Sequence, residues 1–433
     1  MPERGAAVVG LWDVAVIGAG PAGCAAAITL ARAGRRVIVV DRARFPRPKT
    51  CGDGLTTGAL RLLEGLGLEP TAIPTWMPVE DVCIRSPSGR IVELPLPRGR
   101  GQFAAVVPRS DLDNELVQRT RSEGAELIEG ANCLGAVETG DRVVLEVGDL
   151  GTVPARFAIA ADGMWSPTRK YLGLTPGGYL GDWHAFRQYW TGVAPPARRA
   201  MWVWFEDEIL PGYAWSFPLG DGRANVGFGV RRNGPVAVGD MGRFWQNRLG
   251  VSGTRSGRGM QVGDMGRFWQ DLLERDHIRA VLGDAATPEA HHRAWPIPAR
   301  IDRMPLTSRR TMFVGDAAAA TDPMSGEGIA QALLTGIGAA GAVLVGGTDA
   351  DRVMAGYRRF VRRELFADHR MARGLGRILA HRSGARGAVR IAGLTPWTRR
   401  NFARWLFEDY PRSIIATPHR WPGKPLTTPG AYR

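Results

Sequence analysis

The chain has 433 residues, of which 44% are hydrophobic, and its formal net charge at pH 7 is +14. At roughly 150 residues per domain this length predicts two or more domains. No run of about 18 uninterrupted apolar residues occurs, which argues against a membrane-spanning helix. The N-terminus lacks a signal-peptide layout, and the four cysteines have neither CxxC nor metal-ligand spacing. These features imply no structural metal and favour a protein of the reducing cytoplasm.

The first 41 residues predict a strand, a glycine turn, a helix and a second strand. An apolar run at 14–17 precedes the turn Gly18-Ala19-Gly20-Pro21-Ala22-Gly23, helix formers follow at 25–33, and the next apolar run, 37–40, ends in Asp41. The glycines permit a tight turn, close approach to a pyrophosphate and close helix–strand packing. The helix N-terminus attracts phosphate, and Asp41 is placed to bind a ribose hydroxyl. The pattern predicts a dinucleotide site without choosing between FAD and a nicotinamide.

Residues 42–161 are expected to contain short helices and strands in alternation. The loop 42–55 is too rich in Pro and Gly for regular structure. Helices are predicted at 57–66 and 109–121, where apolar residues recur at helical spacing. Strands are predicted at 81–85 and 91–96, which form a hairpin, and at 103–107, 126–128, 131–137, 142–147 and 155–161.

The segment 180–230 is rich in aromatic residues and alternates as strands do. The turn Leu219-Gly220-Asp221-Gly222-Arg223 is typical of a hairpin. We therefore predict a separate antiparallel sheet with one aromatic face. That face is either part of a core, since aromatic side chains bury much area, or the wall of a large apolar binding cavity.

An identical nonapeptide occurs twice, at 238–246 and at 262–270. Solenoid repeats need three or more copies, so this repeat indicates a local duplication. The second copy continues into an amphipathic helix that extends to residue 282. Residues 239–261 are expected to form an inserted surface segment without a function.

The last third of the chain predicts a second ligand-binding turn and then a basic helical region. A buried strand from residue 311 leads to Gly315-Asp316, to a glycine turn and to a helix at 329–344, which again presents a helix N-terminus to a ligand. Helical spacing continues from 350 to 378, and the tail after 411 is rich in Pro. Between residues 352 and 404 there are fourteen Arg against two acidic residues. Such a face attracts anionic lipid or nucleic acid, although a solvated basic surface fits equally well.

These pieces resemble the FAD-dependent geranylgeranyl reductase family, within the p-hydroxybenzoate-hydroxylase-like flavoprotein superfamily, over about residues 12–345. Three motifs imply FAD: the glycine loop with Asp41, the loop Asp162-Gly163 with Ser166 and Arg169, and the two glycine turns after residue 314. An Arg at the position of Arg109 contacts FAD in this superfamily. By this resemblance the FAD-binding residues are Gly18, Gly20, Pro21, Ala22, Gly23, Asp41, Arg42, Cys51, Gly52, Arg109, Asp162, Gly163, Gly315, Asp316, Pro323, Gly326, Gly328 and Ile329.

Two further motifs narrow the resemblance to the reductases. The loop Pro48-Lys49-Thr50-Cys51-Gly52-Asp53-Gly54 is similar to their Lys-x-Cys-Gly-Asp-Gly loop. Residues 211–218 are similar to their Tyr-x-Trp-x-Phe-Pro signature, which lies against the substrate cavity, whereas flavin halogenases have a Trp-x-Trp-x-Ile-Pro version. The resemblance implies that Tyr213, Trp215 and Phe217 contact substrate, and the neighbouring Trp202 and Trp204 are expected to join them.

The expected fold is α/β (α+β overall), with a Rossmann-like FAD-binding domain, a discontinuous antiparallel substrate domain and a helical C-terminal segment. The expected boundaries are 12–75 with 105–170 and 290–345 for the FAD-binding domain, 76–104 with 171–289 for the substrate domain, and 346–433 for the basic C-terminal region.

The expected activity is reduction of C=C bonds in an isoprenoid chain: a geranylgeranyl lipid, a prenyl diphosphate or a menaquinone side chain. The reduced flavin supplies the hydride, and aromatic faces stabilise developing positive charge by about 0.5–2 kcal/mol each. The candidate catalytic residues are Cys51, Tyr213 and Trp215, with Cys51 as a proton donor or a flavin contact. Alternatives are an FAD monooxygenase of an apolar substrate and a non-catalytic prenyl carrier.

The expected partners are a prenyl lipid and NADPH or ferredoxin as electron donor, with no nucleic acid. The basic C-terminal region is expected to contact a membrane, which places the protein in the cytoplasm or at the inner face of the membrane.

Overall fold

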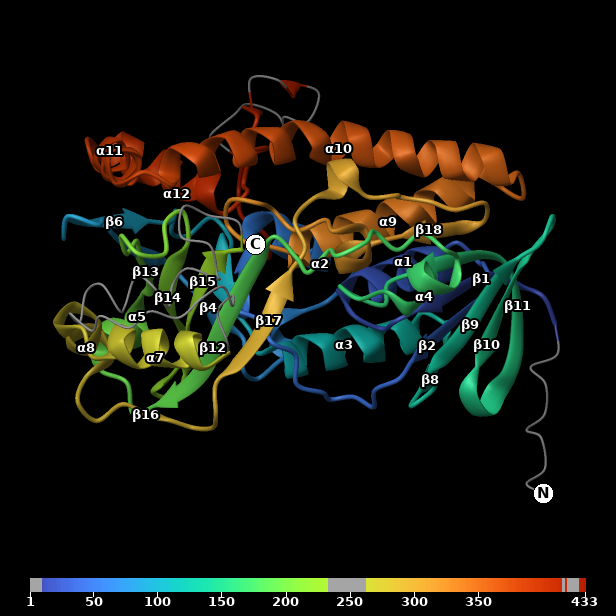
Figure 1. Ribbon diagram of the computed structural model, residues 1–433, viewed down its shortest axis with the longest axis horizontal. Coiled ribbons are helices and arrows are strands. Elements are labelled where there is room, and N and C mark those ends of the chain that lie inside the picture. The colour runs from blue at the N-terminus through green and yellow to red at the C-terminus, as the bar shows by residue number, and fades with distance from the viewer. Residues whose placement is uncertain (1–9, 233–261, 415–416, 419–427) are drawn as a thin grey trace, which may run out of the picture.

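The computed structural model describes residues 10–232, 262–414, 417–418 and 428–433. Two large sheets lie side by side, and a layer of helices from the C-terminal third runs along one side of both (Figure 1). This arrangement confirms the predicted α/β fold with a second sheet and a helical C-terminal segment.

A seven-stranded sheet contains the predicted nucleotide-binding strands. Its order is β8-β2-β1-β11-β10-β9, and β18 pairs with β11. Pairing is parallel among β8, β2, β1, β11 and β18 and antiparallel between β9, β10 and β11. The strands are β1 (Trp12–Ile17), β2 (Val37–Asp41), β8 (Glu126–Glu129), β9 (Cys133–Glu138), β10 (Val143–Val147), β11 (Gly151–Ala160) and β18 (Thr311–Phe313).

Helices α1 (Pro21–Arg32) and α9 (Ile329–Gly346) pack closely because small residues face each other. A Cβ atom on Gly336 would lie 2.1 Å from the Ala22 carbonyl oxygen, and one on Gly338 would lie 2.2 Å from the Phe360 ring in α10 (Ala350–Leu379). Helix α9 is long and apolar enough to cross a membrane by length and composition alone, with a mean hydropathy of 1.8, but 67% of it is buried inside the protein. The Ala- and Gly-rich sequence of α9 thus permits close packing between α1 and α10.

The aromatic segment forms most of an eight-stranded sheet in the order β16-β12-β15-β14-β13-β5-β6, with β17 beside β12. All pairs are antiparallel except β13 with β5. The strands are β5 (Asp81–Arg85), β6 (Ile91–Pro95), β12 (Trp183–Thr191), β13 (Met201–Trp204), β14 (Tyr213–Gly220), β15 (Arg223–Arg231), β16 (Thr287–Pro288) and β17 (Arg293–Ile297). The pairing of β17 with β12 places 293–297 in this sheet, so the expected boundary at residue 290 is wrong there.

A small sheet and two helices join the large sheets. Its order is β3-β7-β4, all antiparallel, from β3 (Gly54–Thr56), β4 (Met77–Pro78) and β7 (Ala104–Val106). Helix α2 (Thr57–Gly65) starts at the end of β3, where the Thr56 hydroxyl accepts from the Ala59 N–H. Helix α3 (Arg109–Ser122) follows β7. Both predicted helices are present.

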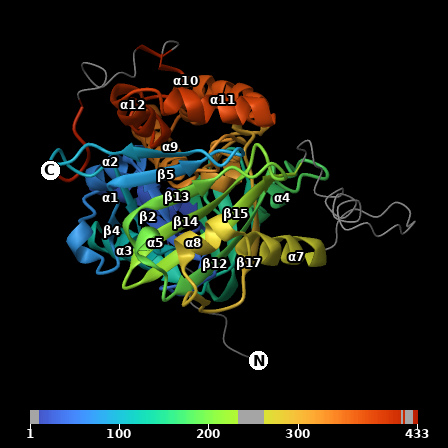
Figure 2. The ribbon, with the colours of Figure 1, turned by 90° about the vertical axis from the view of Figure 1, so that its left-hand side faces the viewer.

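The remaining helices lie in connections and at the C-terminus. Helices α11 (Arg382–Ala392) and α12 (Pro396–Leu406) follow α10 and cover the eight-stranded sheet (Figures 1 and 2). The others are α4 (Pro167–Tyr171), α5 (Pro195–Arg199), α7 (Val262–Leu273), α8 (Asp276–Leu282) and the 3₁₀ turns η1 (Pro70–Ala72), η2 (Gly148–Leu150), η3 (Ile301–Arg303) and η4 (Gly315–Ala318). The second copy of the repeat lies in α7, whereas the insert 239–261 lies outside the described residues.

Candidate functional site

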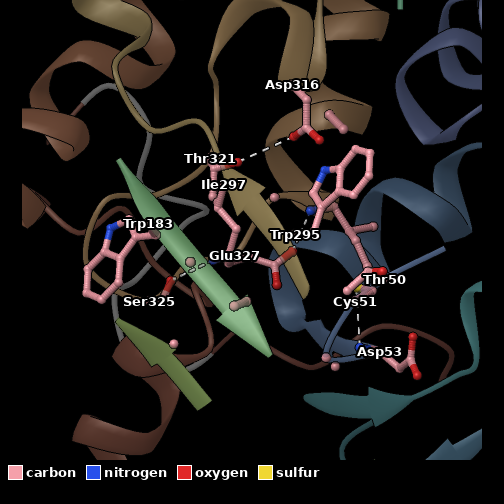
Figure 3. A pocket seen from close by; sticks show the side chains of 18 of the residues that line it. Thr50, Cys51, Asp53, Trp183, Trp295, Ile297, Asp316, Thr321, Ser325 and Glu327 are labelled. Carbon is pink, nitrogen blue, oxygen red and sulfur yellow. Dashed lines mark hydrogen bonds between the residues drawn. The ribbon is translucent and has the colours of Figure 1, made fainter. Parts of the chain in front are cut away.

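A cavity of about 790 Å³ runs between the two large sheets and the C-terminal helices. Its polar end lies at the carboxyl ends of β1 and β2, where open α/β sheets bind their ligands. Its apolar end lies between the eight-stranded sheet and α10, α11 and α12. Figure 3 shows part of the cavity, where Cys51, Asp53, Trp295, Asp316 and Glu327 are among the residues that line it. Segments far apart in the sequence thus share one site.

The cavity brings together most of the residues expected to bind the dinucleotide. Gly18 has φ +103°, and a Cβ there would lie 2.4 Å from the Ala161 carbonyl oxygen, so only glycine fits between the loops after β1 and β11. The Asp41 carboxylate accepts hydrogen bonds from the N–H groups of Ala19 at 2.7 Å and Ala43 at 2.8 Å, which fixes it at the rim. The expected residues that line the cavity are Gly18, Gly20, Pro21, Ala22, Asp41, Arg42, Cys51, Gly52, Arg109, Asp162, Gly163, Gly315, Asp316, Gly326, Gly328 and Ile329.

The polar groups and the free space at the polar end of the cavity fit FAD. The Asp162 Oδ1 atom is buried without a partner among the described residues, whereas its Oδ2 accepts from the Thr168 N–H at 2.9 Å. A Cβ on Gly20, before α1, would meet no atom closer than 3.9 Å, so the N-terminus of α1 opens on free space. A free acceptor, an accessible helix N-terminus and Asp41 are the groups that a dinucleotide requires.

Two expected cofactor residues do not line the cavity. A Cβ on Gly23 would lie 1.9 Å from the Gly18 carbonyl oxygen, so this glycine permits the packing of α1 on β1. The Pro323 carbonyl accepts from the Trp183 Nε1 at 3.2 Å, which ties the turn before α9 to the eight-stranded sheet. Both residues support the walls of the cavity.

The signature strand β14 presents an aromatic ladder to the cavity. Ring centroids are 6.0 Å apart for Tyr213 and Trp215 and again 6.0 Å for Trp215 and Phe217. The Trp215 ring lies between two glycines: a Cβ on Gly227 would approach its Cζ2 to 2.4 Å, and one on Gly52 its Cε2 to 3.8 Å. The Tyr213 hydroxyl donates to the Ser325 carbonyl. Strand β14 is therefore held against both the loop at 48–54, called the cysteine loop because it contains Cys51, and the turn before α9.

Trp202 and Trp204 were expected on this face, and the structure contradicts that expectation. Side chains alternate along a strand, and in β13 it is Met201 and Val203 that line the cavity. Trp204 is fully buried in the core on the other face, and Trp202 stacks on it with centroids 6.0 Å apart. These two tryptophans therefore belong to the packing of the sheet, away from the cavity.

A buried polar network connects the cysteine loop to the aromatic strand. The Asp53 Oδ2 accepts from the Tyr189 hydroxyl and from the Asn225 Nδ2, both at 2.7 Å. Asn225 also donates to the Cys51 carbonyl at 2.8 Å and accepts from the Trp215 Nε1 at 3.1 Å. Burial raises the pKa of Asp53 to about 6, against the lowering effect of its hydrogen bond from Tyr189. Asp53 thus joins strands β12 and β15 to the loop at 48–54.

Three carboxyl or thiol groups in or beside the cavity hold protons near neutral pH. Burial raises the pKa of Cys51 to about 11 and that of Glu327, which lines the cavity, to about 7. Glu327 accepts from the N–H groups of Ile329 and Ala330 at the start of α9, which lowers its pKa in part. Burial also raises the pKa of Glu408, after α12, to about 8. Burial thus raises the pKa of Glu327 toward the range that suits a general acid at neutral pH.

Sequence reasoning missed several residues of the site. Trp295 lines the cavity with the Lys49 ammonium 4.4 Å from its ring centroid, and its Trp-Pro-Ile-Pro context was the available signal. Glu327 lay inside a recognised motif without being assigned a role. The C-terminal region also supplies cavity walls, which its charge did not indicate: Leu375, Ile378, Leu379, Ala388, Val389, Ala392, Phe402, Trp405, Leu406 and Phe407.

Comparisons with known proteins agree with this geometry. A family described as FAD binding domain matches residues 12–209. The chain is 32% identical over 362 residues to a menaquinone reductase of Mycolicibacterium smegmatis, covering 77% of each chain. It is 31% identical over 333 residues to a digeranylgeranylglycerophospholipid reductase of Methanopyrus kandleri, covering 75% of each chain.

A solved structure shares the fold over nearly the whole chain. It is a geranylgeranyl bacteriochlorophyll reductase-like protein of Thermoplasma acidophilum, with a TM-score of 0.72 at 22% identity, covering 95% of this chain and 99% of that one. Together with the cofactor cradle and the two reductase motifs, these matches confirm the predicted family and FAD as the cofactor. The chain belongs to the geranylgeranyl reductase family of FAD-dependent oxidoreductases.

Proposed function

We propose that the protein reduces a C=C bond in the isoprenoid side chain of a menaquinone. The observation that carries the proposal is the continuity of the cavity, which leads from the FAD cradle past Tyr213, Trp215 and Phe217 to the apolar walls of α10, α11 and α12. A long, neutral hydrocarbon chain fits such a space, and menaquinone reductases are among the relatives of this chain. The tail of a geranylgeranylated glycerolipid is the second candidate, because reductases of that lipid are relatives as well.

The reaction adds a hydride and a proton to the two carbons of the double bond. When bound and reduced, FAD supplies the hydride. The aromatic faces of Tyr213 and Trp215 stabilise positive charge that develops on the tertiary carbon, by about 0.5–2 kcal/mol each. The same rings exclude water from the apolar part of the cavity, and Asn225 holds the Trp215 ring in place through the indole N–H.

Glu327 is a better proton source than Cys51, the residue that sequence reasoning favoured. A thiol with a pKa of about 11 is a poorer acid than a carboxyl with a pKa of about 7. Cys51 instead shapes the loop, since its Sγ accepts from the Asp53 N–H at 3.3 Å. Proton transfer from Glu327 to the alkene breaks its O–H bond and forms a C–H bond, and solvent protons restore the acid afterwards.

Two aspects of the proposal concern the surroundings of the enzyme. Electrons come from NADPH or ferredoxin in transient contact, because the sequence has no second complete dinucleotide fingerprint. The enzyme works in the cytoplasm at the inner face of the membrane, where its basic C-terminal region meets anionic lipid.

The test uses the purified protein loaded with FAD and reduced with dithionite without oxygen. Menaquinone, a geranylgeranylated glycerolipid and geranylgeranyl diphosphate are supplied separately, and mass spectrometry measures the gain of two hydrogens per bond. We expect menaquinone to be reduced fastest. Failure to reduce any of the three refutes a reductase, and a product that contains an added oxygen after exposure to air indicates a monooxygenase instead.

A further inference from the structure

Three large apolar side chains are exposed within seven residues, on α11, the turn after it and the start of α12. Ile391 is 63% exposed, Leu394 59% and Trp397 58%. Single exposed apolar residues are common on soluble proteins, but a group of them marks an interaction site. Figure 1 places α11 and α12 at one end of the helical layer, over the eight-stranded sheet.

The same surface is basic. Arg386, Arg390 and Arg400 are exposed, and the sequence contains no Asp or Glu between Asp368 and Glu408. Two arginines of α11 have an acidic neighbour: Arg382 pairs with Asp207 at 3.2 Å, and Arg386 lies close enough to the same carboxylate to lower its pKa. Exposed Ile, Leu and Trp beside arginine are the composition of a helix that lies in the interface of an anionic bilayer. We call Ile391, Leu394 and Trp397, with these three exposed arginines, the α11–α12 surface.

Helix α11 is apolar on its inner side as well. Ala388, Val389 and Ala392 line the cavity, and Ile391 lies at the edge of the same apolar stripe, because residues three apart are neighbours on a helix. The apolar stripe of α11 is therefore wider than the part that faces the cavity, and Ile391 at its edge is exposed. A thin wall thus separates the cavity from whatever covers the α11–α12 surface.

The cavity reaches the protein surface close to this wall. Ile378, near the end of α10, lines the cavity and is nevertheless 56% exposed. Leu375 and Leu379 line the cavity on the same helix. The opening therefore lies between α10 and α11, with apolar side chains at its rim.

We propose that the α11–α12 surface docks on an anionic lipid bilayer and that the isoprenoid tail passes from the bilayer into the cavity beside Ile378. The first part assigns residues to the membrane contact proposed above for the basic C-terminal region, and the second part rests on the proposed activity, since it takes the tail of a membrane lipid as substrate. A second copy of the chain fits less well as the occupant, because a symmetric contact places identical patches together and would oppose arginine with arginine.

The docking is tested with the FAD-loaded full chain and vesicles of phosphatidylcholine, with or without phosphatidylglycerol. We expect sedimentation with the anionic vesicles, weakened by salt. The double variants Ile391→Ser/Leu394→Ser and Arg386→Gln/Arg390→Gln should each lose at least roughly tenfold in vesicle binding. The matched control is Val137→Ser on β9, which removes a 65% exposed apolar side chain from the seven-stranded sheet and should change nothing.

Two measurements separate the possible outcomes. Unchanged vesicle binding by both double variants overturns the docking, and a dimer that they convert to monomer identifies a second copy as the occupant. With menaquinone as the substrate, both double variants should lose turnover when the menaquinone is in vesicles. They should keep wild-type turnover when the same lipid is supplied in neutral detergent. Equal loss in both forms also contradicts the docking.

The opening is tested with Ile378→Trp, which narrows the rim at an exposed position. We expect this variant to bind vesicles as wild type does and to lose at least roughly tenfold in turnover of menaquinone in either form; unchanged turnover refutes the opening. If wild type reduces no isoprenoid lipid while vesicle binding still depends on the α11–α12 surface, the proposed reductase activity fails and the docking stands.

Discussion

The position of Trp215 depends on the absence of a side chain at Gly227, and replacing this glycine tests that dependence. In Gly227→Ala the new Cβ would lie 2.4 Å from the Trp215 Cζ2 and 2.3 Å from the Phe186 carbonyl oxygen. Real Cβ contacts are not this short, so the ring and the backbone of β12 must both move. Overpacking of this kind costs about 1–3 kcal/mol.

A matched control lies two residues further along the same strand and on the same face. Gly229 borders the cavity, and a Cβ there would meet no atom within 4 Å. The substitution Gly229→Ala should therefore be neutral, or stabilise by roughly 0.5 kcal/mol through the lower entropy of the unfolded chain. The two variants carry the same chemical change and differ only in the space around the new methyl group.

The assay is urea unfolding of the FAD-loaded protein, followed by tryptophan and flavin fluorescence. We expect Gly227→Ala to lower the free energy of unfolding by at least about 1 kcal/mol relative to Gly229→Ala, and to lower turnover because the aromatic face is displaced. Equal stability and activity of the two variants would show that Trp215 does not rest on β15 as described.

Three further predictions concern the buried polar groups. Asn225→Leu removes three hydrogen bonds at a buried position and should cost about 3 kcal/mol, at roughly 1 kcal/mol for each bond. Asn401→Leu at the surface of α12 should cost less than about 0.5 kcal/mol, and equal costs for the two variants would contradict the network. Burial, with the nearby charges of Asp322 and Glu327, raises the folded-state pKa of Glu408 above its ordinary value of 4.5, so the stability linked to its bound proton is full below about pH 4.5 and is lost as the pH rises through the raised pKa. Glu408→Gln should therefore gain stability relative to wild type between pH 5 and pH 9, and parallel pH curves would refute the raised pKa. Glu327→Gln retains an oxygen that caps α9 but has no acidic proton, so turnover should fall roughly 100-fold or more with an unchanged flavin spectrum; full activity would exclude Glu327 as the proton source.

Much of the cofactor end could be predicted because its signals are local. A glycine turn between an apolar run and a helix has few alternative structures, and Asp41 follows from the end of the next strand. The turn at 315 follows a buried strand in a similar way, whereas the loop at 162 was identified by its resemblance to the flavoprotein superfamily; all three meet at one end of the cavity. The structure explains why these positions are glycine: a side chain on Gly18 would clash with Ala161, and one on Gly23 would clash with Gly18.

The substrate end was predicted less completely. The alternation of β13 predicts two faces but not which one lines the cavity, so Trp202 and Trp204 were assigned to the wrong side of the sheet. Likewise, the local sequence around Asn225 does not indicate that its side chain donates a hydrogen bond to Asp53, because the two residues are 172 positions apart in the chain. Both questions depend on how the sheets pack.

The sequence by itself determined the family, the cofactor and the aromatic strand that lines the cavity, since each is encoded in a short run of residues with its own geometry. Only the tertiary structure decided that α10, α11 and α12 close the apolar end of the cavity. Arginine is so frequent in these three helices that their sequence indicates a charged surface. The apolar residues between the arginines are too dispersed to indicate that the helices share one buried face. That face exists only when the three helices pack on the sheet, because burial is a property of the folded neighbours rather than of the local sequence.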